Sequence, residues 1–172
     1  MIKESDSEGR RPIAGRKPRR RPMYNGQYSE GGFRQFATMT TLIAGPPGSG
    51  KTTYVRSRAG VNDLVVDLDT LYAALSGHAR YEKPDALLPF ACEARDAVEN
   101  RLLSVSDVDR AWIIKCAPKR ADRDYYVRRG AAMVVLDVPA EECLRRIASD
   151  PERLNEPWEL LIRQWWSEYE PE

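Results

Sequence analysis

The most informative part of this chain reads Gly45-Pro46-Pro47-Gly48-Ser49-Gly50-Lys51-Thr52. It matches the pattern G-x-x-x-x-G-K-[ST] at every fixed position, and it lies between a short apolar segment and a predicted helix, the context that makes the pattern meaningful. Glycines let backbone N–H groups turn inward around a phosphate, and the helix N-terminus adds a partial positive charge. We therefore predict that Gly45–Thr53 bind a nucleoside triphosphate, which we expect to be ATP with Mg²⁺.

Three side chains at the end of this loop have separate predicted roles. Lys51 is expected to bridge the β- and γ-phosphates, and the Thr52 hydroxyl is expected to ligate Mg²⁺. Thr53 could contact the α-phosphate or could be a helix residue without a ligand, and the sequence leaves both possibilities open.

Strand-like and helix-like segments alternate along the rest of the chain. Apolar and β-branched runs predict strands over 40–44, 63–68, 110–116 and 132–138, and we expect the last of them to be fully buried. Apolar spacing and turn residues predict helices over 51–58, 70–76, 87–102, 120–129, 139–148 and 158–169. The predicted fold class is therefore α/β, a P-loop NTPase with a small parallel sheet of four to five strands and helices on both faces.

The last predicted helix carries an aromatic stripe. Its Trp158, Trp165, Trp166 and Tyr169 could stack on bases, as exposed aromatic side chains do in single-strand binders. Helical spacing favours packing against the core instead, with one of the two adjacent tryptophans exposed.

The charge of the chain divides it into two predicted parts. Residues 1–38 hold nine Lys and Arg against four Asp and Glu, and few aliphatic residues, which predicts a basic, disordered N-terminal tail. A nucleic-acid or partner-binding arm is the alternative, and translation could also begin at Met39. Residues 39–172 are the predicted P-loop domain, and their net charge of −4 argues against a tight, sequence-blind grip on a long nucleic acid.

Composition also limits metal, redox and membrane functions. Cys92, Cys116 and Cys143 have unrelated spacings, and His78 is the single histidine, so a structural zinc site is excluded and His78 is expected at the surface. Free thiols suit a reducing compartment, and no run approaches the length of a membrane span, so a cytoplasmic location without membrane contact is expected.

The sequence lacks the motifs that are typical of other classes of P-loop protein. No Asp-Glu pair follows any predicted strand, as a ring ATPase would require, since Val134–Asp137 continues into Val138-Pro139. A GTPase would need Asn-Lys-x-Asp, which is absent. A small phosphotransferase remains.

Residues 41–170 resemble the P-loop polynucleotide 5′-kinase and zeta-toxin-like group of small kinases, common in phages and bacteria. Besides the loop, the resemblance depends on the acidic segment Asp67-Leu68-Asp69, on Asp137-Val138-Pro139-Ala140-Glu141-Glu142, and on the helix with Leu144-Arg145-Arg146 followed by Arg153. It implies transfer of the γ-phosphate of ATP to a hydroxyl, with a polynucleotide 5′-end or nucleotide-like molecule as the acceptor.

The resemblance also implies residue roles. Asp69 would take the proton from the acceptor hydroxyl, or would be the N-cap of the following helix. Asp67 would assist Mg²⁺ or cap the strand end, and Arg146 and Arg153 would close over the phosphates or lie on a solvated helix face. Lys119, Arg120 and Arg123 could line the acceptor pocket, although solvent exposure is expected for each.

Two positions depart from the family pattern and leave the acceptor open. The third strand ends in Lys115-Cys116 rather than Ser-Asp, and Tyr72 stands where some polynucleotide kinases hold the acceptor phosphate with an arginine. Arg80 and Arg95 are possible replacements. The alternative function is an ATP-binding switch for a DNA-processing partner, and a monomer or weak oligomer is expected in either case.

Overall fold

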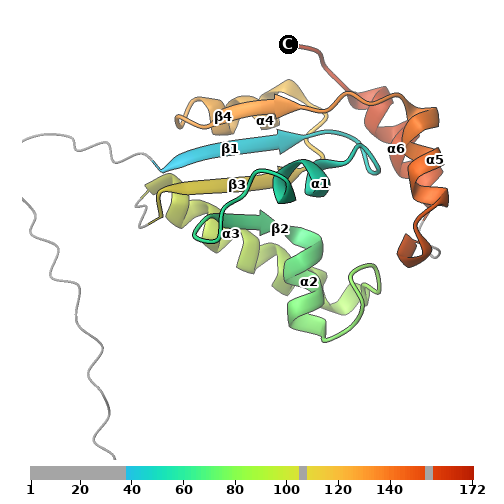
Figure 1. Ribbon diagram of the computed structural model, residues 1–172, viewed down its shortest axis with the longest axis horizontal. Coiled ribbons are helices and arrows are strands. Elements are labelled where there is room, and N and C mark those ends of the chain that lie inside the picture. Colours follow the sequence, from blue (N-terminus) through green and yellow to red (C-terminus); the bar gives the residue numbers. More distant parts are fainter. Residues whose placement is uncertain (1–37, 105–107, 154–156) are drawn as a thin grey trace, which may run out of the picture. The chain divides into compact units, whose positions relative to one another are not determined.

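The computed structural model describes residues 38–104, 108–153 and 157–172, so the predicted tail lies outside the described residues except for Thr38. The described chain contains a parallel four-stranded sheet in the order β2-β3-β1-β4 (Figure 1). The strands are β1 Met39–Ala44, β2 Leu64–Asp67, β3 Arg110–Lys115 and β4 Ala132–Val135. This confirms the predicted fold class, at the lower of the two predicted strand numbers.

Helices follow the strands in the predicted order. They are α1 Lys51–Arg56, α2 Leu68–Ser76, α3 Leu88–Ser104, α4 Arg120–Val127, α5 Ala140–Ala148 and α6 Trp158–Glu168, with short 3₁₀ turns at Asp85–Leu87 and Pro151–Arg153. Their ends differ from the predicted ones by at most two residues. No helix in the described part of the chain is both long and apolar enough to cross a membrane.

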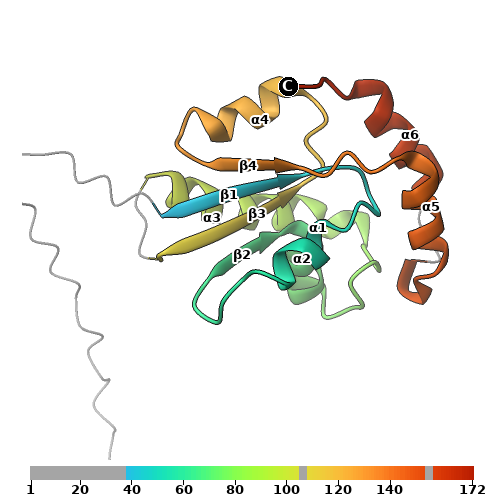
Figure 2. The same cartoon turned by 45° about the horizontal axis from the view of Figure 1, so that its top comes forward.

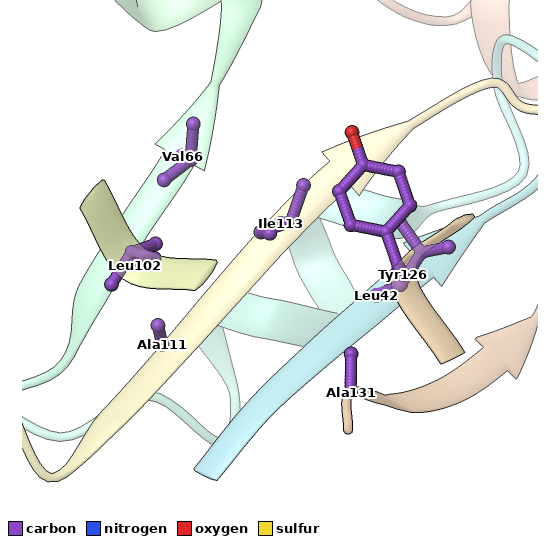
Figure 3. Close-up of a cluster of buried hydrophobic side chains, with 7 residues drawn as sticks. All are labelled: Leu42, Val66, Leu102, Ala111, Ile113, Tyr126 and Ala131. Atoms are coloured by element: carbon purple, nitrogen blue, oxygen red, sulfur yellow. The ribbon is translucent and has the colours of Figure 1, made fainter. Parts of the chain in front are cut away.

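One face of the sheet packs against α3 and α4. Side chains alternate between the faces of a strand, so Leu42 of β1 and Ile113 of β3 point to the same side. Figure 3 shows them with Leu102 of α3 and Tyr126 of α4 in one cluster of buried side chains. This cluster is the hydrophobic core between the sheet and these two helices.

The other face is covered by α1. Ile43 and Trp112, the strand neighbours of the residues above, are buried against Val55 of α1 in a second cluster. The indole N–H of Trp112 donates to Asp63 Oδ2 at 2.9 Å, which satisfies its polar atom beside β2. Helices on both faces of the sheet are therefore confirmed.

The prediction of a fully buried fourth strand is wrong. β4 pairs only with β1, and its residues are half-buried or exposed. Its continuous apolar run resembled that of a central strand, but the strand lies at the edge of the sheet, where one side has no neighbouring strand in the described residues.

The last two helices lie beyond the carboxyl ends of the strands (Figures 1 and 2). α5 and α6 pack on each other through Cys143, Ile147 and Ile162, which are buried. On α6, Trp165 is 3% exposed and Trp166 is half-buried, which confirms the core-packing interpretation for Trp165. The two helices thus form a cover over the edge of the sheet where the loop lies.

Candidate nucleotide and acceptor site

The glycine-rich loop connects β1 to α1 at the carboxyl edge of the sheet. Gly45, Gly48 and Gly50 have positive φ angles of 150°, 78° and 93°, a conformation that side chains other than glycine rarely adopt. A Cβ on Gly48 would stand 2.7 Å from the carbonyl oxygen of Cys143 in α5. The glycine therefore serves two purposes: it allows the turn, and it lets α5 lie directly against the loop.

Lys51 folds its ammonium group over this loop. Nζ donates to the carbonyl oxygens of Gly45 and Pro46, each at 2.8 Å. The positive charge is thereby held at the mouth of the loop, where the N-terminus of α1 also begins. Thr53, two residues further along, is exposed and lines the adjoining cavity.

Thr52 and Asp67 meet where the sequence predicts the metal. Thr52 Oγ1 donates to Asp67 Oδ2 at 3.4 Å. The guanidinium of Arg80 donates to Thr52 Oγ1 at 3.1 Å and forms an ion pair with Asp67 Oδ2. Arg80, considered as a replacement for an acceptor-binding arginine, thus lies at the predicted metal position.

Asp69 lies in the first turn of α2, and its suggested alternative role as the N-cap is wrong. The cap is Asp67, whose Oδ1 accepts a hydrogen bond from the backbone N–H of Asp69 at 3.1 Å. The Asp69 carboxylate lines the cavity, and its Oδ1 is 3.1 Å from Nζ of Lys83. Two carboxylates therefore face the cavity at the carboxyl end of β2.

Arg146 reaches the loop from α5. Its Nη1 donates to the carbonyl oxygen of Ser49 at 3.0 Å, and its Nε pairs with Glu142 at 2.6 Å. Glu142 also pairs with Arg145, and hydrogen bonds from Arg145 and Arg146 lower the pKa of this carboxyl from 4.5 to about 2. Arg145 and Arg146 are both exposed and both pair with Glu142, as the solvated-face alternative expects, and Arg146 also contacts the loop.

Arg153 lies in the cavity wall but does not reach the loop. Its guanidinium stands 4.5 Å from the ring centroid of Tyr81 and 5.0 Å from that of Trp158, and Nε pairs with Asp150 at 3.0 Å. The indole N–H of Trp158 donates to the carbonyl oxygen of Arg153 at 2.7 Å. The arginine is thus fixed between two aromatic rings from different parts of the chain.

A cavity of about 1050 Å³ joins these groups. It extends from the loop and the two aspartates to a wall built by α3, the end of β3, α4 and α6. Four polar side chains of that wall meet at Glu99, a cluster that the sequence does not predict: Arg95, Glu99, Lys115 and Tyr126.

The basic residues expected near the acceptor pocket are placed elsewhere. Lys119 and Arg120 are exposed, as expected, and neither lines the cavity. The expectation of solvent exposure is wrong for Arg123, which is fully buried. Its guanidinium donates to the carbonyl oxygens of Ala117 and Glu170. These hydrogen bonds attach the C-terminal segment to the loop after β3.

Two cavity-lining residues that the sequence does not single out, Glu99 and Lys115, carry little local signal. Glu99 follows Arg95 by four positions, a common pair on solvated helices, and nothing local marks it as buried. Lys115 was noted only as a departure from the family pattern. No group of three or more His, Cys, Asp or Glu suited to a metal ion exists in the described residues.

Comparisons with known proteins show the fold and no more. No family model and no curated protein matches this sequence. Among solved structures, shikimate kinase from Acinetobacter baumannii in complex with shikimate aligns over 77% of this chain and 76% of its own, with 23% identity and a TM-score of 0.50. A chain of the Pnkp1/Rnl/Hen1 RNA repair complex aligns over 76% of this chain at 18% identity and a TM-score of 0.49, and this chain spans 46% of its length. The likeness to this shikimate kinase supports the predicted α/β P-loop fold.

Proposed function

We propose that this chain is an ATP-dependent phosphotransferase, which moves the γ-phosphate of ATP to a hydroxyl group held in the cavity. One observation carries the proposal: the loop and two carboxylates open on a cavity that continues to a polar wall on α3 and α4. A nucleotide switch needs a pocket for the nucleotide, whereas this cavity adds a second, polar compartment suited to an acceptor.

Lys51, Thr52 and the loop backbone would bind the triphosphate. Loop N–H groups and the Lys51 ammonium match the negative charge of the phosphates, and Arg146 adds a second cation from α5. Because α5 lies against Gly48, a change in the loop on triphosphate binding would also shift α5 and its Arg146.

Asp69 is the proposed general base. It would accept the proton of the acceptor hydroxyl while the acceptor oxygen forms a bond to the γ-phosphorus. The bond from the γ-phosphorus to the bridging oxygen breaks, and ADP leaves with that electron pair. Lys83, 3.1 Å from Asp69, would hold the carboxylate toward the cavity.

The residues around Thr52 fit a divalent cation. A hydroxyl and a carboxylate oxygen are the ligands that Mg²⁺ prefers, and here they already surround a positive charge, the guanidinium of Arg80. Bound Mg²⁺ would neutralise charge on the β- and γ-phosphates. Thr52 would ligate it directly and Asp67 directly or through water, and Arg80 would have to withdraw.

Arg153 would join the transfer only after a rearrangement. Its guanidinium must leave the two aromatic rings before it can approach a phosphate. We therefore propose Arg146 as the phosphate-binding arginine of the closed cover, with Arg153 as a residue that moves during closure.

The proposal is tested by transfer of labelled γ-phosphate from ATP to a panel of acceptors. The panel holds 5′-hydroxyl DNA and RNA, nucleosides and small polyols, so the hypothesis of a polynucleotide or nucleotide-like acceptor is tested with it. Wild type is compared with Lys51→Ala and Asp69→Asn, and with Glu141→Gln, an exposed carboxylate outside the cavity, as the control.

We expect transfer to one acceptor class, lost in Lys51→Ala and Asp69→Asn and kept in Glu141→Gln. Binding of ATP without transfer to any acceptor, together with slow hydrolysis that needs Lys51 and not Asp69, would refute the proposal. That result would favour the ATP-switch alternative.

A further inference from the structure

The polar wall of the cavity is organised around one buried carboxylate. Glu99 of α3 is 5% exposed. Its Oε2 accepts a hydrogen bond from the hydroxyl of Tyr126 at 2.5 Å and lies 2.9 Å from Nζ of Lys115. Burial and the contact with Glu99 raise the pKa of Tyr126, so this hydroxyl remains a donor.

The second oxygen of this carboxylate has no hydrogen-bond donor. Oε1 of Glu99 is buried and accepts no hydrogen bond from any of the described residues, while Nε of Arg95 lies 3.8 Å away as an ion-pair partner. An unpaired buried acceptor costs about 1–3 kcal/mol, so such atoms in folded proteins normally meet a ligand or water. Glu99 is one of the residues that line the cavity, so a donor on an occupant that reaches Oε1 would satisfy it.

The charges around Glu99 balance. Lys115 is paired with Glu99, and Arg95 is paired with Asp96 at 2.8 Å and lies near Glu99. Asp122 adds another carboxylate to the cavity lining. The described residues of this wall therefore offer no surplus positive charge. A phosphate or carboxylate group bound here would be repelled by the carboxylates, or would give up its hydration without gaining a cationic partner.

We propose that Glu99 is a specificity-determining residue of the acceptor site, and that it binds an uncharged group through a donated hydrogen bond to Oε1. The group is a hydroxyl or an amino or imino N–H, which a sugar or a nucleobase edge can supply. The inference depends on the proposed function insofar as it takes the occupant of this wall to be the phosphoryl acceptor.

The first test is equilibrium binding to the intact protein, in the presence of ADP and Mg²⁺ so that no transfer occurs. The probes are matched pairs that differ by one phosphate: guanosine with guanosine 3′-monophosphate, cytidine with cytidine 3′-monophosphate, and myo-inositol with an inositol monophosphate. We expect the uncharged member of at least one pair to bind about tenfold more tightly than its phosphorylated partner. The nucleoside and polyol arms show which source supplies the donor.

Three variants connect the preference to Glu99. Glu99→Gln keeps the shape but removes the negative charge, so binding of the preferred uncharged probe should fall about tenfold and the phosphorylated partner should gain. Glu93→Gln, an exposed residue of the same helix outside the cavity, should behave as wild type. If Glu99→Gln fails to fold, Lys115→Met gives the opposite test, because removing this cation should weaken the phosphorylated probes further and spare the uncharged ones.

The outcomes separate this inference from the proposed function. It is overturned if phosphorylated probes or 5′-hydroxyl oligonucleotides bind best, if no uncharged probe binds, or if the preference is unchanged in Glu99→Gln and in Lys115→Met. Glu99-dependent binding of an uncharged probe, with no transfer of phosphate to any acceptor of the panel, would support the binding site and refute the phosphotransferase. Phosphate transfer without a preference for uncharged probes would support the phosphotransferase and refute the proposed role of Glu99.

Discussion

Replacing Arg123 by methionine would remove a buried cation that connects the C-terminal segment to the sheet. The guanidinium is completely buried, donates to the carbonyl oxygens of Ala117 and Glu170, and pairs with Glu172 at 2.8 Å. It also lies 5.4 Å from the ring centroid of Tyr169. Methionine fills much of the same volume but supplies no donor.

The expected loss of stability follows from the acceptors that remain. Three carbonyl oxygens, those of Ala117, Pro118 and Glu170, lose a charged donor, at about 1–3 kcal/mol for each one that stays buried, and the half-exposed Glu172 can recover water. Methionine regains some apolar contact, and the end of the chain can fray to admit water. We therefore expect a loss of about 3 kcal/mol, which corresponds to a fall of about 10 °C in Tm for a domain of this size.

Urea denaturation followed by fluorescence measures this loss directly. The matched control is Arg128→Met at the C-cap of the same helix, whose exposed ion pair with Asp124 at 3.3 Å should contribute less than about 0.5 kcal/mol. A loss below about 1 kcal/mol for Arg123→Met, or equal losses in both variants, would show that the buried guanidinium does not hold the segment in place.

Three further predictions concern the loop and its cover. Gly48→Ala should weaken ATP binding at least about tenfold in calorimetric titration, because the new Cβ would meet the Cys143 carbonyl at 2.7 Å in a left-handed backbone. Arg80→Ala should lower the Mg²⁺ concentration needed for half-maximal ATP turnover, since a competing cation is removed; a higher requirement contradicts the proposed metal position. The pKa of Glu142 is lowered from 4.5 to about 2, mainly by Arg145, so its ionised form stabilises the fold above about pH 4.5 and this contribution is lost as the pH falls toward 2. Denaturation at about pH 6 and about pH 3 should therefore show a smaller pH dependence in Glu142→Gln than in wild type.

The sequence predicts those parts of the structure that neighbouring residues determine by themselves. The loop was predictable because glycine at fixed spacing, between an apolar run and a helix, determines the backbone by itself. The elements were predictable from apolar periodicity, and Asp67 and Asp69 could be assigned to the end of β2 for the same reason. The structure differs in the N-cap of α2, which is Asp67 and not Asp69, because α2 begins two residues earlier than its apolar pattern suggests.

The errors arose where position in the sheet or a distant partner decides the outcome. β4 has the composition of a central strand, but strand order is a property of the whole chain, and the order here leaves β4 at the edge. Arg123 looks like a surface residue of a basic helix, and its burial depends on the carbonyl group of Glu170, 47 residues further along the chain. Glu99 and Lys115 meet only because α3 lies under the carboxyl end of β3, which periodicity alone cannot indicate.

The arginine between two aromatic rings gives the protein an internal optical reporter. Of the four tryptophans in the chain, three lie on α6, and Trp158 is in contact with the guanidinium of Arg153. If Arg153 leaves this position when the site fills, the indole of Trp158 loses a neighbouring cation and its environment becomes more polar. Emission intensity and wavelength would then change with ligand concentration, so closure could be followed in real time by stopped-flow fluorescence without any attached label.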